Sequence, residues 1–268
     1  MAAANDVDVT GGYSALSQRA SLQRLESCRT ALNAKRVVDI AGAMAFGVLA
    51  LPAMALIWAV IRLDSPGPAL FRAKRIGRGG KTFSMYKFRT MIHGADERLH
   101  EYAHLNLANG MVKIPNDPRV TRTGKWLRRF SLDELPQIYN ILAGHMSLVG
   151  PRPHDVHELP QTGLQDEPRF GMRPGLTGLW QVSARSDPSL ESRVRIDLDY
   201  VNRWSLVLDA KILARTVPAV VSGAGGKVHQ TTSPTQVSPI AKAGIGSNAL
   251  VGPTSGMQLA DLTPGPQE

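Results

Sequence analysis

The dominant feature of the hydropathy pattern is an uncharged run at residues 40–61. Only Gly42, Gly47 and Pro52 among these 22 positions are not apolar. A straight helix of this length rises about 33 Å, enough to cross a hydrocarbon core of about 30 Å. The pattern therefore predicts a membrane helix over residues 35–63, with a helix buried in a soluble core as the alternative.

The flanks of this run indicate how it meets the membrane. Residues 19–36 carry a net charge of +4 and residues 62–89 a net charge of +7. Because positive flanks stay on the cytoplasmic side, a single crossing conflicts with one of them. Pro52 removes a helical hydrogen bond and leaves two arms, each about half a bilayer long. We therefore predict a re-entrant helical hairpin broken at Pro52, with an ordinary kinked span as the alternative.

Shorter patterns predict a mixed domain over residues 64–222. Two extended runs around a glycine-rich turn are typical of a β-hairpin, and three further stretches have a helical period. The hairpin covers residues 69–76 and 82–88, and the helical stretches cover residues 94–108, 132–142 and 189–221. The predicted fold class is α+β: a re-entrant membrane helical hairpin plus a cytoplasmic, mostly helical domain with a β-hairpin and amphipathic interfacial helices.

The two ends of the chain differ from this middle part. Residues 1–34 are a polar leader rich in small residues, without the pattern of a signal peptide. Residues 223–268 contain 8 glycines and 5 prolines but only four charged residues. Such a composition predicts a disordered tail.

Composition and charge then narrow the classes of function. The 268 residues include 31 Lys and Arg against 22 Asp and Glu, a formal net charge of +9. This excess favours anionic partners: nucleic acid, phosphorylated small molecules or a lipid surface. The single cysteine, Cys28, excludes an internal disulfide framework and a cysteine-based zinc site.

Residues 100–104 read His-Glu-Tyr-Ala-His, the H-E-x-x-H pattern of zinc proteases. On an α-helix, His100 and His104 would lie one turn apart and bind the metal, with Glu101 as the base. Charged neighbours and the lack of a clear third ligand favour an exposed polar helix face instead. A membrane-associated zinc metalloprotease is kept as the alternative function.

A second motif joins basic residues to a pair of acids. Residues 119–129 hold five Arg and Lys and no acid, and residues 131–136 read Ser-Leu-Asp-Glu-Leu-Pro. Ser131 and Glu134 fit a capping box at a helix start, which is the structural explanation. A carboxylate placed there, Asp133, is expected to be exposed and ionised, so it can also act as a nucleophile or a magnesium ligand beside a polyphosphate.

Further candidate residues lie in loops. Pro151 and Pro153 hold Arg152 on an extended backbone, as a phosphate clamp requires, although a plain rigid turn explains the prolines equally well. Lys87 and Arg89 place two cations at the end of the predicted hairpin. The loop around Trp180 suits a pocket wall for a base or a sugar, with Arg173, Gln181 and Arg185 as its polar side chains.

Taken in this order, the segments resemble the bacterial sugar transferases, the monotopic polyprenyl-phosphate phosphoglycosyl transferases, over about residues 35–221. The one apolar segment indicates the small form without the amino-terminal transmembrane bundle. The matching residues are Lys35, Arg36, Asp39, Pro52, Gly67, Pro68, Phe71, Arg75, Gly77, Tyr86 to Met91, Asp117 to Arg119, Thr121, Arg122, Leu127 to Gln137, Ser147 to Pro153, Arg173 to Gly175 and Gly178 to Gln181.

The resemblance implies a two-step reaction at the cytoplasmic face of the bacterial inner membrane. Asp133 would attack the sugar-linked phosphorus of a UDP-sugar and release UMP. Undecaprenyl phosphate would then take the phosphosugar, which primes exopolysaccharide or other surface-glycan synthesis. The resemblance also implies Mg²⁺ bound at Asp133 and an orienting or proton-handling role for Glu134. The phosphate- and substrate-binding residues predicted on this basis are Lys87, Arg89, Arg128, Arg129, Arg152, Arg173, Gln181 and Arg185.

The expected partners are therefore a UDP-sugar, undecaprenyl phosphate and membrane lipid, with a homodimer as one possibility and no nucleic acid. A third class of function is a non-catalytic basic membrane scaffold. Such a scaffold would need anionic lipid and would turn over no nucleotide sugar.

Overall fold

A computed structural model describes residues 15–105, 114, 116–157, 167–184 and 190–222. The predicted disordered tail and most of the N-terminal half of the predicted leader lie outside these residues. The helices are α1 (Ala15–Ser27), α2 (Arg29–Asp64), α3 (Arg122–Arg129), α4 (Gln137–Leu142), α5 (Leu179–Ser183), α6 (Leu190–Arg203) and α7 (Leu206–Val221). The strands are β1 (Leu70–Ile76), β2 (Thr82–Phe88), β3 (Ser147–Val149), β4 (His154–Asp155) and β5 (Gly175–Thr177), and the short 3-10 helices are η1 (Arg78–Gly80), η2 (Glu97–Leu105), η3 (Leu132–Glu134) and η5 (Pro168–Gly171).

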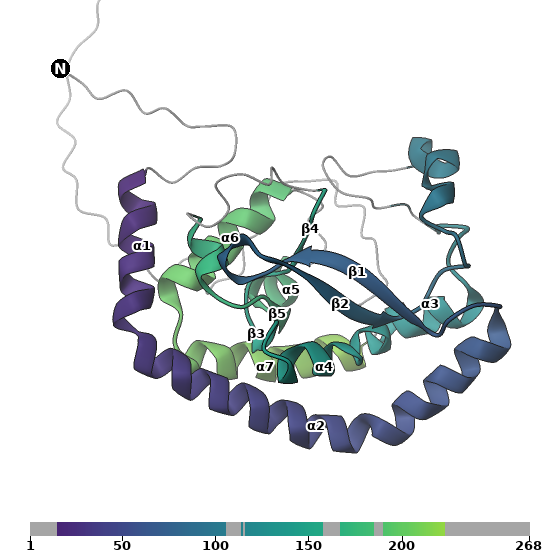
Figure 1. The fold of residues 1–268 in the computed structure, drawn as a ribbon, viewed down its shortest axis with the longest axis horizontal. Coiled ribbons are helices and arrows are strands. Elements are labelled where there is room, and N and C mark those ends of the chain that lie inside the picture. The colour runs from purple at the N-terminus through teal and green to yellow at the C-terminus, as the bar shows by residue number, and fades with distance from the viewer. Residues whose placement is uncertain (1–14, 106–113, 115, 158–166, 185–189, 223–268) are drawn as a thin grey trace, which may run out of the picture. The chain divides into compact units, whose positions relative to one another are not determined.

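The apolar segment forms one helix of 36 residues rather than two arms. Helix α2 runs through Pro52 without interruption and curves in an arc whose two ends turn toward the other elements (Figure 1). Pro52 is exposed and cannot donate a backbone hydrogen bond, which makes bending at this point easier. By length and composition α2 can cross a membrane, and only 11% of its most apolar 18-residue window is buried.

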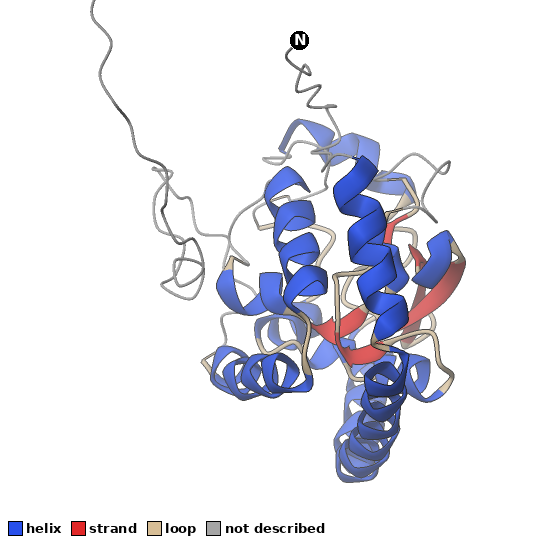
Figure 2. Ribbon diagram, turned by 90° about the vertical axis from the view of Figure 1, so that its left-hand side faces the viewer, coloured by secondary structure: helices blue, strands red, loops and turns tan. Residues whose placement is uncertain are grey.

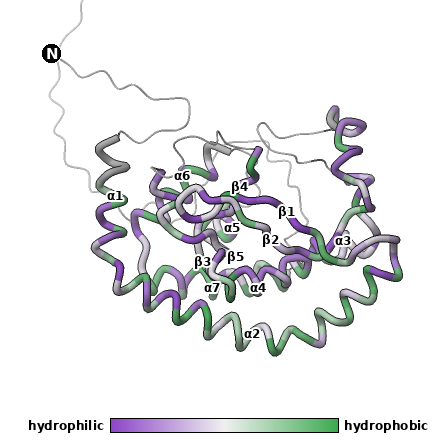
Figure 3. The backbone as a smooth tube through the Cα atoms, in the orientation of Figure 1, coloured by the Kyte–Doolittle hydropathy of each residue, from purple (hydrophilic) through white to green (hydrophobic). Residues whose placement is uncertain are grey.

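One stripe of α2 packs against the rest of the protein along the whole helix. Ala43 and Ala50 contact a cluster that includes Ile141 and Met146, while Ile61 packs near the other end with Leu127. The opposite side is apolar and exposed. Figure 3 shows the hydrophobic character of α2 as a mostly green tube. Its most exposed residues are Val37, Val48, Leu49, Leu51, Leu56 and Leu63. A narrow buried stripe and a broad exposed apolar side are what a helix between protein and lipid requires.

The predicted β-hairpin is confirmed to within one residue. Strands β1 and β2 are antiparallel, with Leu70 opposite Phe88 and Ile76 opposite Thr82. Gly79 and Gly80 make the turn with φ angles of +67° and +72°, a region that favours glycine. Two features were not predicted: β4 pairs with β1 as a third strand, and β3 pairs with β5 in a separate parallel sheet.

The predicted helical stretches are present in a more broken form. In the stretch at 94–108, the described residues form the 3-10 helix η2 over Glu97–Leu105, and residues 106–108 lie outside the described part. The stretch at 132–142 is divided into η3 and α4 around Pro136. The stretch at 189–221 is the helix pair α6 and α7, and Figure 2 shows the helices gathered around the short strands with α2 lowest. Ser131 has a left-handed backbone, with φ of +55°, and its side chain makes no capping hydrogen bond. The capping-box prediction was therefore wrong.

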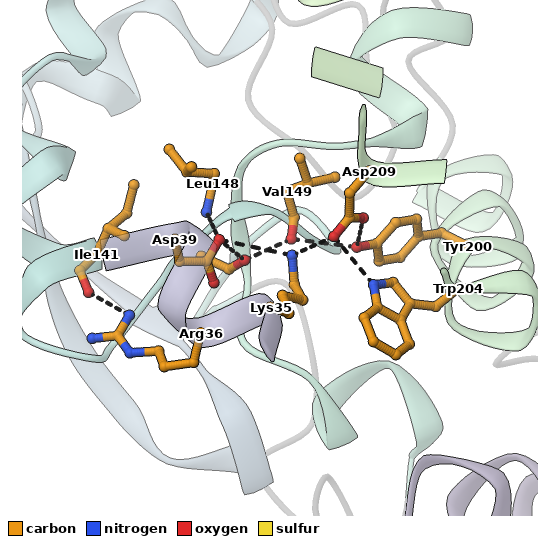
Figure 4. A network of polar contacts seen from close by, with 10 residues as sticks. Lys35, Arg36, Asp39, Ile141, Leu148, Val149, Tyr200, Trp204 and Asp209 are labelled. Carbon is orange, nitrogen blue, oxygen red and sulfur yellow. Dashed lines mark hydrogen bonds and ion pairs between the residues drawn. The ribbon is translucent and has the colours of Figure 1, made fainter. Parts of the chain in front are cut away.

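A buried polar network fixes the start of α2 (Figure 4). Lys35 Nζ lies 2.7 Å from Asp209 Oδ2 on α7, and Asp209 also accepts hydrogen bonds from the Tyr200 hydroxyl and the Trp204 indole at 2.7 and 3.2 Å. Asp39 Oδ1, one turn along α2, accepts hydrogen bonds from Ser147 Oγ and the Leu148 backbone at 2.9 and 3.0 Å.

The charges in this network are well enclosed. Lys35, Asp39 and Asp209 are each less than a tenth exposed. Burial and the neighbouring Asp209 raise the pKa of Tyr200 well above 10, so its hydroxyl stays protonated and continues to donate. The network thus joins α2 to α6, α7 and β3 by contacts that are specific in direction as well as in charge.

Replacing one partner of this network tests its contribution to stability. Lys35→Met leaves Asp39 and Asp209 buried without their cation, so the free energy of unfolding should fall by about 3–5 kcal/mol. Chemical denaturation in detergent micelles measures it. Lys74→Met, the same change at an exposed site on β1, should alter it by less than about 0.5 kcal/mol. Equal losses of unfolding free energy in the two variants would show that the buried network stabilises the protein no more than an exposed lysine does.

Candidate active site

The acidic pair lies on a short, well-fixed turn between α3 and α4. Ser131 reverses the chain after α3, and η3 then carries Asp133 and Glu134. Leu132 and Leu135 on either side pack against the apolar cluster that contains Ile61 and Phe88. This anchoring explains why Asp133 is buried although it belongs to a loop-like segment.

Burial changes the electrostatics expected for Asp133. The sequence predicts an exposed, fully ionised carboxylate, whereas the structure encloses it. Loss of water raises the pKa of Asp133, Lys87 lowers it, Glu134 raises it and Arg128 lowers it, in that order of size. The ionised carboxylate therefore depends on its two cationic neighbours, and a further cation would lower its pKa more.

Lys87 links the end of β2 to the acidic pair. Its Nζ lies 3.1 Å from Glu134 Oε1, with both side chains about one-fifth exposed. Arg128 on α3 is tied to the segment that follows β2, because its Nε donates to Thr90 Oγ1 at 2.9 Å. Burial lowers the pKa of Arg128, and Asp133 and Asp117 raise it. Two cations from separate elements are thus held beside Asp133.

A polar pocket of about 400 Å³ opens beside this turn. Glu134 lies in its wall, whereas the preceding residue, the buried Asp133, is not one of the lining residues. The lining residues are Arg75, Met85, Lys87, Glu134, Gln137, Arg152, Pro153, Asp155, Gly175, Leu176, Gln181 and Arg193. Four cations against two acids give the pocket a positive balance that suits a diphosphate.

Arg152 is held in the pocket by its backbone as well as by stacking. Pro151 and Pro153 have no backbone N–H, so Arg152 supplies the one backbone donor of residues 151–153. This N–H donates to Asp197 Oδ2 at 3.2 Å. The Arg152 guanidinium carbon lies 5.3 Å from the Trp180 ring centre, and that of Arg193 lies 5.1 Å from it. Trp180 is therefore a buried platform for two guanidinium groups.

Gln181 also lies in the pocket wall, as the sequence predicts. Its Oε1 is buried and makes no hydrogen bond to any residue in the described part of the chain. An acceptor of this kind in a pocket suits a hydroxyl or N–H donor of a ligand. Sequence reasoning missed Arg75, Gln137, Asp155 and Arg193. The sequence around these residues gives little indication of a pocket. Arg75 and Asp155 reach it through the pairing of β1 with β4, and Arg193 reaches it through the packing of α6 against α5.

Three other predicted binding residues have partners away from the pocket. Arg89 is buried and donates to the Ser65 carbonyl at 2.8 Å and to that of Pro66, next to the end of α2. Arg173 Nε donates to the Gly144 carbonyl at 2.8 Å. Arg129 is exposed beside the rings of Trp126 and Phe130. These positions give each of the three a structural role, while Arg185 lies outside the described residues.

The H-E-x-x-H segment is not arranged for zinc. It lies on the 3-10 helix η2. Such a helix has three residues per turn, so His100 and His104, four positions apart, lie on different sides of it. Glu101 is bound by Arg98, with Nη2 and Oε2 2.9 Å apart, and all three motif side chains are exposed. The zinc-protease alternative therefore has no structural support.

The acidic pair fits a substrate-borne magnesium ion better than a preformed metal site. Within the described ranges, no group of three or more His, Cys, Asp or Glu side chains is placed to hold a metal. Mg²⁺ is commonly held by one or two carboxylates together with substrate phosphates. Asp133 and Glu134 supply two such carboxylates beside a pocket of positive balance.

Comparison with known proteins agrees with this geometry. Residues 30–223 match the family described as Bacterial sugar transferase. The chain is 41% identical to the Galactosyl transferase CpsE of Streptococcus agalactiae over 199 residues, 73% of this chain and 44% of CpsE. It is 42% identical to the Exopolysaccharide production protein ExoY of Rhizobium meliloti over 197 residues, 72% of this chain and 87% of ExoY.

A third relative carries a more specific name. It is the UDP-glucose:undecaprenyl-phosphate glucose-1-phosphate transferase of Caulobacter vibrioides, 41% identical over 196 residues, 70% of either chain. The chain thus spans less than half of CpsE but most of ExoY. It belongs to the bacterial sugar transferase family.

The different surroundings of Arg152 and Arg89 give a paired prediction. Arg152→Lys replaces a planar fork by a point charge, so binding of UDP should weaken about tenfold, roughly 1.4 kcal/mol, with stability unchanged. Arg89→Lys loses carbonyl contacts next to the end of α2, so the unfolding temperature should fall while UDP affinity stays the same. Calorimetric titration and thermal unfolding measure both. Weaker UDP binding in Arg89→Lys would show that Arg89 contributes to ligand binding.

Proposed function

We propose that this protein transfers a sugar-1-phosphate from a UDP-sugar to undecaprenyl phosphate. The products are UMP and undecaprenyl-diphosphate-sugar, in the priming step of exopolysaccharide or another surface glycan. The observation that carries the proposal is the buried Asp133 carboxylate with cationic neighbours, next in sequence to Glu134 in the wall of a positively charged pocket. The names of the relatives support the donor and the lipid carrier.

The pocket offers binding groups for the donor. Arg152 and Arg193 on the Trp180 platform supply fixed forks for the diphosphate oxygens. Gln181 Oε1 and Gln137 offer polar groups for the sugar or the uracil. The relatives include enzymes named for galactose and for glucose, so the family name does not choose the sugar.

In the first half-reaction, a carboxylate oxygen of Asp133 attacks the phosphorus that bears the sugar. A new bond forms from Asp133 to this phosphorus, the bond to the bridging oxygen breaks, and UMP leaves with that oxygen. Lys87 and Arg128 lower the pKa of Asp133 against the larger effect of its burial, and so favour the ionised form that attacks. Glu134, paired with Lys87, orients that cation or handles protons.

In the second half-reaction, a phosphate oxygen of undecaprenyl phosphate attacks the same phosphorus. The bond to Asp133 breaks, which restores the free carboxylate and completes the lipid diphosphate sugar. When bound, Mg²⁺ would neutralise charge on the diphosphate, with Asp133 and Glu134 as its protein ligands. Two half-reactions let a soluble donor and a lipid acceptor use one site in turn.

The proposed location is the cytoplasmic face of the bacterial inner membrane, with α2 re-entrant. Both ends of α2 pack on the same body, through Lys35 and Asp209 at one end and Ile61 and Leu127 at the other. A straight crossing would pull one of these ends away from its partners. The packing therefore supports an arc whose two ends stay on one side, which also satisfies the positive flanks.

Release of UMP from a panel of UDP-sugars tests the proposal. Wild-type protein in membranes should release UMP from at least one donor. Asp133→Asn keeps the size of the side chain but removes the nucleophile, so it should release UMP at least about a thousandfold more slowly. Glu134→Gln should keep a slow first half-reaction. Asp199→Asn on α6, a matched change outside the site, should stay near the wild-type rate. Undiminished turnover in Asp133→Asn would refute the mechanism, and no turnover by the wild type would favour the scaffold.

A further inference from the structure

Helix α3 has one side that the catalytic account does not use. We define the outer face of α3 as Arg122, Lys125, Trp126 and Arg129, all of which are exposed. Trp126 is 60% exposed, an unusual fraction for so large an apolar side chain. No acidic residue occurs from Pro118 to Leu132, so this face has a net positive charge.

The opposite side of α3 is fixed firmly to the body. A Cβ atom added at Gly124 would lie only 2.0 Å from the Thr90 carbonyl oxygen, so only glycine allows this approach. Thr121 caps the helix by accepting a hydrogen bond from Gly124 N at 3.0 Å. Arg128 turns inward and bonds Thr90 Oγ1. Because the inner side is held in this way, the direction of the outer face is fixed too.

The outer face combines cations with stacked aromatic rings. Trp126 and Phe130 lie 5.9 Å apart at an interplanar angle of 16°, and the Arg129 guanidinium carbon is 5.7 and 5.5 Å from their ring centres. Aromatic rings beside cations are typical of the interface between lipid tails and phosphate headgroups. Such a surface suits neither pure solvent nor a hydrocarbon core.

This face continues the exposed apolar surface of α2. Figure 1 shows α3 beside the C-terminal end of α2, and Ile61 packs against Leu127 in one cluster. There α2 has the same kind of pair, with Trp58 51% exposed and the Arg62 guanidinium carbon 5.8 Å from its ring centre. Asp64, the last residue of α2, accepts a hydrogen bond from the Thr123 backbone N–H at 3.3 Å, which joins the start of α3 to the end of α2.

We propose that the outer face of α3 docks on the phosphate headgroups of anionic phospholipids. The proposal rests on the membrane placement of α2 but not on the chemistry at Asp133. Charge complementarity and continuity with α2 single out lipid as the occupant. The turn η3 that carries Asp133 follows α3 directly and packs against it, so this docking sets that turn at the depth of the headgroups. A phosphate group carried by a lipid acceptor lies at that depth.

Hydrogen–deuterium exchange of the full chain in lipid nanodiscs tests this docking. Amides of α3 should exchange on the order of tenfold more slowly in discs with about one-third phosphatidylglycerol than in neutral phosphatidylcholine discs, since each basic residue near such a surface contributes about 1 kcal/mol. Arg122→Gln with Lys125→Gln should remove most of this difference. Lys74→Gln with Lys81→Gln, an equal loss of exposed charge on the β1–β2 hairpin, should leave it intact.

The outcomes separate lipid docking from its alternatives. Equal exchange of α3 in neutral and anionic discs, or equal loss in both double variants, would overturn the proposal. Slower exchange only when a disc holds two chains would assign the face to a second copy. UMP release is measured on the same discs as a separate readout. It should be unchanged by Arg122→Gln with Lys125→Gln, so failure of the docking and failure of the proposed reaction are distinguished.

Discussion

The constraint on which the rest of the structure depends is the attachment of α2 to the body at both of its ends. At the start, Lys35 reaches a buried contact with Asp209, 2.7 Å away on a helix more than 170 residues later in the chain. At the finish, Ile61 packs with Leu127, and Arg89 binds the carbonyl of Ser65. These contacts at both ends of α2 are the basis on which we propose a re-entrant helix rather than a crossing one.

The same attachment places the chemistry near the lipid surface. Helix α3 packs on the C-terminal end of α2, and the catalytic turn follows α3 directly. Asp133 is thereby buried next to Lys87 and Arg128, two cations that offset the cost of enclosing its charge. The pocket beyond Glu134 is wide and positively charged. In the proposed reaction, a soluble nucleotide donor and a lipid acceptor use this one carboxylate in turn.

Local signals in the sequence were sufficient for part of this account. The β-hairpin and the long apolar helix followed from period and composition, and Glu134, Lys87, Arg152 and Gln181 do line one pocket. What failed depended on tertiary context. The Asp133 carboxylate is buried instead of exposed, because Leu132 and Leu135 on either side of it pack against the apolar core. The other missed residues, such as Arg193, arrive through packing that no single segment encodes.

The central claim is that Asp133 carries the phosphosugar between the two substrates, and trapping that species tests it most directly. The protein is incubated with a UDP-sugar labelled at the sugar-linked phosphate, without lipid acceptor, then quenched and digested for peptide mapping. The account predicts label on the peptide that contains Asp133, released by a chase with undecaprenyl phosphate. Label on another residue, or UMP release that requires the lipid acceptor from the first turnover, would contradict it and favour direct displacement.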